Sequence, residues 1–78
     1  MKSIQTHYIG PSATKPSRIV ATDGDNRVIV VYDDFLSVDD NHSVAACQLR
    51  SKLGWIKPMV GGHTKKGMVW VFTDGITI

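Results

Sequence analysis

The sequence has one cysteine, no long apolar run and no residues in a catalytic spacing. Cys47 alone excludes an internal disulfide, which fits a reducing compartment such as the cytosol. No apolar run approaches the roughly 20 residues of a transmembrane helix. Lys2 is followed by polar residues rather than by the apolar core of a signal peptide. We therefore expect a soluble, cytoplasmic protein, with Cys47 acting as a small buried or half-buried side chain.

Catalytic chemistry is also missing. The three histidines, His7, His42 and His63, are far apart in sequence, and none stands in a known spacing with a nucleophile or an acid. The glycine-rich and basic residues 61–67 are not a phosphate-binding P-loop, because no Lys-Ser/Thr pair and no helix follow. We therefore expect no enzyme activity and no cofactor.

Metal binding has weak support. The candidate ligands gather around one segment: Asp33, Asp34, Asp39, Asp40 and His42. Because Asp40, Asn41 and His42 are consecutive, they cannot all converge on a single ion, and acids are stabilised at a helix start without a metal. We expect no metal site, and we expect His42 to pack against a sheet or to bond backbone nearby.

Length and charge limit the architecture. With 78 residues the chain is one small domain, residues 1–78, which buries only about 60–65% of its unfolded surface. A homodimer would add buried surface and stays open as an alternative to a monomer. The net charge of +2 is too small to indicate nucleic acid. However, acids concentrate in residues 23–40 and bases in residues 50–66, so the molecule is expected to be bipolar.

One helix is predicted, over residues 37–55. Ser37 begins it as the first residue of a capping box, with Asp39 or Asp40 as alternative caps. Gly54 suits the left-handed conformation after the last turn, which lets Trp55 fold back onto the helix. One narrow face carries the residues expected to pack on a sheet: His42, Ala45, Ala46, Leu49 and Leu53.

The rest of the chain reads as strands and loops. Residues 23–26 form a turn, so that the strands on either side pair as a hairpin. The β-branched run at residues 27–32 favours a central, well-covered strand. Pro58 favours an edge strand, residues 61–67 read as a flexible loop, and Phe35 and Leu36 are expected to seal the helix junction. The predicted strands are residues 4–9, 18–22, 27–32, 56–60 and 68–72, with a short tail at 76–78.

The predicted fold is therefore α+β, in the order βββ-α-β(β). A mainly antiparallel sheet of four to five strands carries the helix on one face, and the other face, with Val69 and Val71, stays partly open for a partner. Trp70 and Phe72 are expected to form the core beneath the helix. As an alternative, Trp70, Phe72 and Tyr8 stack on nucleobases, with the basic side chains of Lys15, Arg18, Lys65 and Lys66 around them.

The combined pattern resembles a family of small proteins from bacteriophages and mobile elements. The resemblance covers nearly the whole chain. The residues that carry it are Thr6-His7-Tyr8-Ile9-Gly10-Pro11, Ser17-Arg18-Ile19-Val20-Ala21, Tyr32-Asp33, Asn41-His42, Ala45-Ala46, Lys52-Leu53-Gly54-Trp55, and Gly61-Gly62 followed by Gly67-Met68-Val69-Trp70-Val71-Phe72. It departs at Pro16, where the family typically has glycine. The resemblance implies a phage setting, in which proteins of this size often bind host machinery, as anti-CRISPR inhibitors do.

Three functions follow as hypotheses. The first is a non-enzymatic phage or mobile-element protein that binds a host defence complex, such as a CRISPR effector, and blocks its access to nucleic acid. Its expected contact residues are Lys15, Arg18, His63, Lys65, Lys66, Asp33, Asp34, Asp39 and Asp40. The second is a small DNA- or RNA-binding accessory protein that uses Arg18, Lys57, Lys65 and Lys66. The third is a structural subunit of a phage particle.

Overall fold

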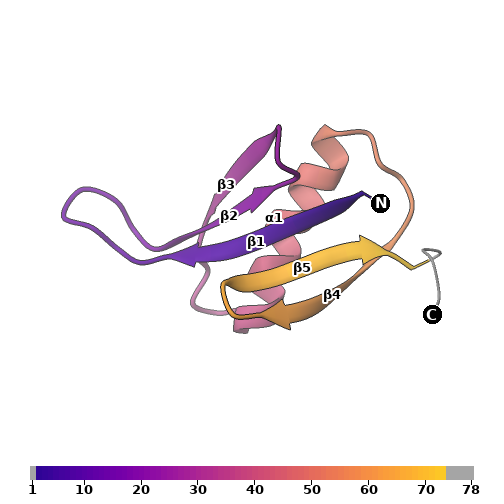
Figure 1. Cartoon of the computed structure of the whole chain (residues 1–78). Coiled ribbons are helices and arrows are strands. Elements are labelled where there is room, and N and C mark those ends of the chain that lie inside the picture. Colours follow the sequence, from indigo (N-terminus) through magenta and orange to yellow (C-terminus); the bar gives the residue numbers. More distant parts are fainter. Residues whose placement is uncertain (1, 74–78) are drawn as a thin grey trace.

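Five strands and one helix make up the computed structural model, which describes residues 2–73 (Figure 1). The elements are β1 (Ser3–Ile9), β2 (Arg18–Thr22), β3 (Arg27–Val31), α1 (Val38–Lys52), β4 (Met59–Thr64) and β5 (Gly67–Phe72). All strands join one antiparallel sheet in the order β3-β2-β1-β5-β4. The predicted α+β class and element order are confirmed. The predicted tail at 76–78 lies outside the described residues.

The β2–β3 hairpin closes through the predicted turn. The Asp23 carboxylate accepts from the backbone N–H groups of Asn26, at 2.7 Å, and Asp25, at 3.1 Å. The Asn26 bond is the main reason why the pKa of the Asp23 carboxyl lies below its ordinary value. Gly24 has φ 108°, which favours glycine. These two hydrogen bonds and the glycine fix a tight turn and the register of the two strands that flank it.

Capping interactions at both ends explain where α1 begins and ends. The Ser37 hydroxyl accepts from the Asp40 N–H at 3.1 Å, so Ser37 is the cap among the three candidates. Gly54 has φ 72°, and the Trp55 N–H donates to the Arg50 carbonyl at 3.0 Å. The helix is therefore shorter than the predicted 37–55, because its flanking residues cap it rather than extend it.

Asn41 ties the start of α1 to the segment before it, a contact that the sequence did not indicate. Its side-chain oxygen accepts from the Asp33 N–H at 2.7 Å, and its amide donates to the Asp33 carbonyl at 2.9 Å. The amide also lies within hydrogen-bond distance of the carbonyls of Leu36 and Ser37. Asn41 is buried, and every polar atom of its side chain has a partner.

The core lies between the small-residue face of α1 and one face of the sheet. Ala45, Ala46 and Leu49 pack on Ile4 and Ile19, and all five are buried. Alanines let the helix approach the strands closely, so that few large side chains suffice. As predicted, Trp55 and Trp70 pack around this cluster, and Trp55 lies against Phe72 with ring centroids 5.6 Å apart.

The predicted central position of residues 27–32 is wrong. β3 is an edge strand, and β1 occupies the centre of the sheet because β5 returns to pair with it. The run of β-branched residues does not decide between the two positions, since such residues suit any pleated surface. Val28 and Val30 are half-buried beside the core, whereas Ile29 and Val31 are exposed.

The predicted loop at residues 61–67 is also wrong. β4 continues to Thr64 and pairs with β5 up to Gly67, so only Lys65 and Lys66 form the turn. The ring of Trp70 explains why glycine is tolerated within this strand. A Cβ built on Gly61 would lie 2.6 Å from ring atoms of Trp70, so the missing side chain gives the indole its place. The edge position that Pro58 predicted for this segment is confirmed.

Three further side chains differ from expectation. Phe35 is fully exposed and does not seal the helix junction, because Asn41 anchors that segment through hydrogen bonds instead. Leu36 is only partly covered. Cys47 is exposed, because it lies just outside the narrow face of α1 that packs on the sheet.

Candidate functional site

The two faces of the sheet differ in chemistry. Residues directly opposite each other on paired strands share a face, so the register assigns every strand residue to the helix side or to the open side. Trp70 pairs with the buried Ile4 and therefore faces the helix. The open side is mixed polar and apolar and includes Gln5, His7, Val20, Ile29, Val60, Val69 and Val71.

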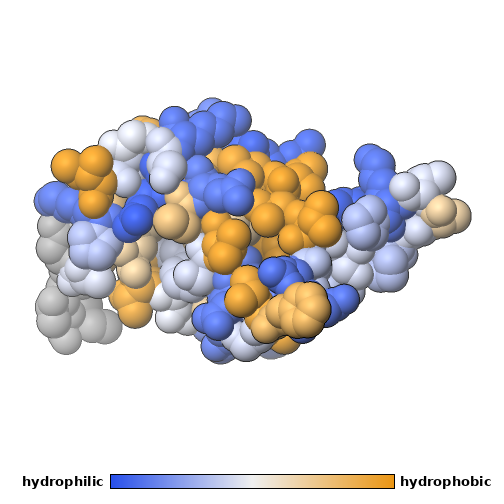
Figure 2. Space-filling model, turned by 180° about the vertical axis from the view of Figure 1, so that it is seen from behind, coloured by the Kyte–Doolittle hydropathy of each residue, from blue (hydrophilic) through white to orange (hydrophobic). Residues whose placement is uncertain are grey.

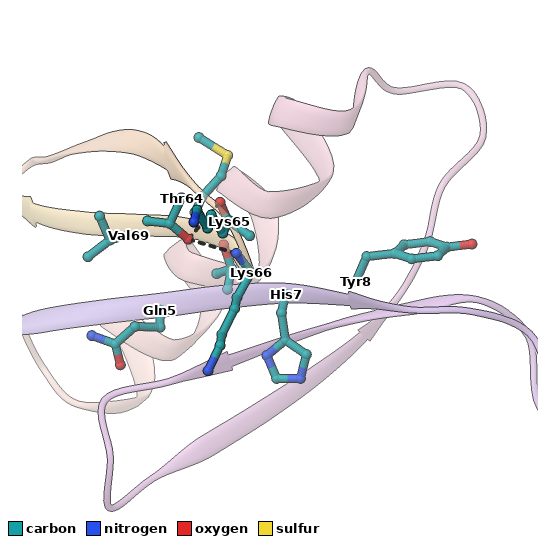
Figure 3. Close-up of a pocket in the computed structure, with 10 residues that line it drawn as sticks. Gln5, His7, Tyr8, Thr64, Lys65, Lys66 and Val69 are labelled. Carbon is teal, nitrogen blue, oxygen red and sulfur yellow. Dashed lines mark hydrogen bonds between the residues drawn. The ribbon is translucent and has the colours of Figure 1, made fainter.

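A hollow of about 590 Å³ lies beside the middle of β1 (Figure 3). It is formed by the β4–β5 hairpin turn and the middle of β1, and its lining residues are Gln5, Thr6, His7, Tyr8, Thr64, Lys65, Lys66, Gly67, Met68 and Val69. The side chains of Gln5, His7 and Lys66 point to the same side of β1, whereas Tyr8 points away from them (Figure 3). Lys65 and Lys66 give this hollow a basic rim.

The basic turn is held by local bonds. The Thr64 hydroxyl donates to the Gly67 carbonyl at 3.2 Å and accepts from the Lys66 N–H at 3.3 Å. Gly67 has φ 153°, and a Cβ there would collide with the backbone oxygen of Thr6. The close approach of β5 to β1 therefore requires glycine and fixes the turn against His7.

The other predicted bases lie elsewhere. Residues 10–17 form an arm that extends beyond the sheet and carries Lys15 (Figure 1). Arg18 lies opposite Ile9 on the open face, and its guanidinium donates to the Pro16 carbonyl at 3.2 Å. Neither base lines the hollow. The structure thus groups Lys65 and Lys66 with Gln5 and His7. Gln5 and His7 were not predicted as site residues, although the alternation in β1 places them on the face of the sheet away from the buried Ile4 and Thr6.

The predicted acids surround the start of α1, on the helix side. Asp33, Asp34, Asp39 and Asp40 are all exposed. His63, on β4, lies 3.1 Å from the Asp39 carboxylate, and both side chains are more than half exposed. This contact joins the acidic helix start to the β4–β5 hairpin that carries the basic turn.

A buried polar network lies beneath this contact. Trp70 Nε1–H donates to the Thr6 hydroxyl at 3.1 Å, and the same hydroxyl lies 2.7 Å from His42 Nδ1. We assign the neutral His42 tautomer whose Nδ1 accepts, because the Thr6 hydroxyl then both donates to Nδ1 and accepts from Trp70. Burial lowers the pKa of His42, while the Asp39 carboxylate acts in the opposite direction.

The network has a structural role. It joins α1 through His42 to the central strand β1 and to its neighbour β5, and so sets the helix start, with its acids, against the hairpin. His42 therefore packs against the sheet, as expected, but it bonds a side chain rather than backbone. Thr6 and Trp70 were not recognised as partners, because they lie 36 and 64 residues from their bonding partners along the chain.

Comparison with known proteins and the grouping of potential metal ligands both bear on function. No family model matches the chain, and no curated protein or solved structure matches it significantly. Within residues 2–73, no group of three or more His, Cys, Asp or Glu side chains could hold a metal ion. In the same part of the chain, α1 is too short and too polar to cross a membrane.

Proposed function

We propose that the chain is a non-enzymatic binding protein of phage or mobile-element origin that docks on a host defence complex, such as a CRISPR effector, and blocks its nucleic-acid access. The observation that carries the proposal is the bipolar end of the molecule. Lys65 and Lys66 surround an open hollow there, and Asp39 joins the acidic helix start to the same hairpin through His63. The phage setting rests on the family resemblance.

Adjacent patches of opposite charge favour a protein partner. Protein interfaces use complementary charge patterns for specificity and association rate, whereas a nucleic-acid surface calls for a continuous basic stripe. On the open face the bases are interrupted by neutral side chains such as Gln5, Val69 and Val71. The acids on the other side of the same end would repel a phosphate backbone.

The orientation of the aromatic residues argues in the same direction. Single-stranded nucleic acids bind to sheets through bases stacked on exposed aromatic rings. Trp70 and Phe72 face the helix, where Trp70 packs on the core and Phe72 lies against Trp55. Tyr8 is exposed, but its hydroxyl donates to Ser17 at 3.0 Å and its ring packs edge-on against Tyr32. The open face therefore lacks a stacking platform in residues 2–73.

Binding to a purified host CRISPR effector complex tests the proposal. Reversing two charges with Lys65→Glu and Lys66→Glu is expected to weaken binding at least about tenfold, which corresponds to about 1.4 kcal/mol. Lys2→Glu is the control. Lys2 directly precedes β1, at the end of that strand away from the hollow, and its amine lies over the ring of Trp55. Circular dichroism checks that each variant is folded. Absence of binding by the unaltered chain, or equal affinity of all variants, contradicts the proposal.

A gel-shift assay at low salt separates the nucleic-acid alternative. We expect no shift with single- or double-stranded DNA or RNA. A shift that weakens steeply with salt, and that Lys65→Glu with Lys66→Glu abolishes, would replace protein docking by nucleic-acid binding as the function.

A further inference from the structure

The edge strand β3 carries unusually little protection against pairing with another strand. Natural edge strands are typically shortened, bulged, or interrupted by Pro or Lys. After Arg27, β3 contains only Val28, Ile29, Val30 and Val31, and its ladder with β2 is continuous. Ile29 is 53% exposed and Val31 is 62% exposed. Figure 2 views the helix side and shows hydrophobic residues gathered beside α1; Ile29 and Val31 belong to the opposite, open face.

The opposite edge offers a poorer template. β4 contains Gly61 and Gly62 and follows Pro58, and the Trp70 ring packs over Gly61. Glycine supplies no side chain for a cross-strand pair and weakens a strand. Of the two edges of the sheet, β3 is the one suited to receive another strand.

The hydrogen bonds next to β3 show which of its backbone groups point outward. The Tyr32 N–H donates to the Ser17 carbonyl, and the Asp23 N–H donates to the Asn26 carbonyl. In an antiparallel ladder, bonded and non-bonded pairs alternate. Val28 and Val30 therefore bond to β2, whereas the N–H and C=O groups of Arg27, Ile29 and Val31 face away from the sheet. Consistently, Lys52 Nζ reaches the Arg27 carbonyl from outside, at 3.5 Å.

We propose that β3 pairs with β3 of a second copy of this chain, antiparallel across a twofold axis, with Ile29 opposite Ile29. Arg27 then lies opposite Val31 of the other copy. The outward groups of Arg27, Ile29 and Val31 in each copy supply about six backbone hydrogen bonds. Because the contact uses the same patch on both copies, it closes as a dimer with one continuous sheet.

Charge favours this arrangement over a parallel one. Arg27 and Lys52 lie together at the start of β3, as the Lys52 contact to the Arg27 carbonyl shows. Asp33 and Asp34 follow its end. The twofold axis brings Arg27 and Lys52 of each copy toward Asp33 and Asp34 of the other, so this attraction occurs twice; Asp23 and Asp25, in the turn just before Arg27, oppose it in part.

The neighbouring register is less favourable. Shifting the pairing toward the end of β3 would set Arg27 opposite Asp33 and would need the backbone groups of Asp33. These are already bonded to the Asn41 side chain, at 2.7 Å and 2.9 Å. The register centred on Ile29 uses only groups that face away from the sheet; one of them, the Arg27 carbonyl, already accepts from Lys52 Nζ at 3.5 Å and keeps a second lone pair for the partner.

Analytical ultracentrifugation of Ile29 variants tests the proposal, since each copy places residue 29 against itself. The unaltered chain is expected to be a dimer. Ile29→Lys and Ile29→Glu alone are each expected to weaken association at least about a hundredfold, because two like charges meet and apolar burial is lost. Mixing the two variants is expected to restore a dimer. Ile29→Thr, which keeps a β-branched uncharged side chain, is the matched control and stays closer to the unaltered chain.

Val31 tests the register independently. Val31→Glu faces Arg27 of the other copy and is expected to keep the dimer, whereas Val31→Lys faces the same arginine and is expected to break it. Ile29 and Val31 are both more than half exposed, so every variant should fold as a monomer, which circular dichroism checks. A monomeric unaltered chain, an open-ended assembly, dimeric Ile29→Lys, or equal effects of the two Val31 variants would overturn the proposal.

Discussion

Replacing Thr6 by valine removes one hydroxyl from the centre of the molecule and keeps the shape of the side chain. That hydroxyl accepts from Trp70 Nε1–H at 3.1 Å and lies 2.7 Å from His42 Nδ1. Thr6 and His42 are almost completely buried, and Trp70 is half-buried. Thr6→Val therefore leaves one donor and one acceptor without their partner in a place that water reaches poorly.

The expected cost follows from the two orphaned groups. A buried polar group that loses its partner costs about 1–3 kcal/mol. Because Trp70 is only half-buried, its indole N–H lies toward the lower end of that range. We expect Thr6→Val to lower the free energy of unfolding by about 2–4 kcal/mol. A chain of this length has about 4–12 kcal/mol in total, so the variant would lose a large part of its stability.

Thr6→Ser is the matched control. It keeps the hydroxyl and loses one methyl group, which costs about 1 kcal/mol. Urea unfolding followed by tryptophan fluorescence gives both free energies, and the indole N–H resonance of Trp70 in an NMR spectrum reports the loss of its bond to Thr6. If hydrophobicity decided the outcome, valine would be the better substitute. Thr6→Val that is as stable as Thr6→Ser would therefore refute the role of the hydroxyl.

Two further predictions concern the same region. Burial lowers the pKa of His42 in the folded protein. As the pH falls below about 6.5, His42 therefore takes up a proton in the unfolded chain before it does so in the folded one. Stability that is present above that pH should be lost on acidification. The ionisable groups that act on it are Asp39, His63 and His7. Thermal melting between neutral and mildly acidic pH should show this loss, and His42→Gln should flatten it; an unchanged slope in that variant would assign the dependence to other groups. Gly67→Ala should cost about 3 kcal/mol or more, because a Cβ collides with the backbone of β1 at a positive φ. Gly62→Ala, whose Cβ meets open space, should change the melting temperature little, and equal effects of both would contradict the steric argument.

The helix ends and the turn could be predicted from the sequence because the interactions that fix them are local. Ser37 and Gly54 lie within a few residues of the backbone groups that they serve, so helix ends follow from short-range chemistry. The turn at Asp23 is equally local. The alternation in β5 separated the helix-facing Trp70 and Phe72 from Val69 and Val71 on the open face, and Trp70 packs against the core as predicted.

Whether a strand lies at the edge or at the centre of the sheet could not be predicted from the sequence in the same way. The β-branched run of β3 indicated a covered strand, yet β3 lies at the edge, whereas the more polar β1 lies at the centre. Strand order depends on which distant strands pair, and no local pattern records that β5 returns to β1. Gly61 and Gly62 indicated a loop for a similar reason, since their place in a strand depends on the ring of Trp70.

The candidate site followed the same division. Charge counts along the chain already separated an acidic from a basic region, because they need no coordinates. The folded chain decided that Lys65 and Lys66 flank a hollow with His7, that Lys15 lies apart on an arm, and that Asp39 reaches His63. Such contacts join residues far apart in sequence, and they exist only once burial of the core has set the helix on the sheet.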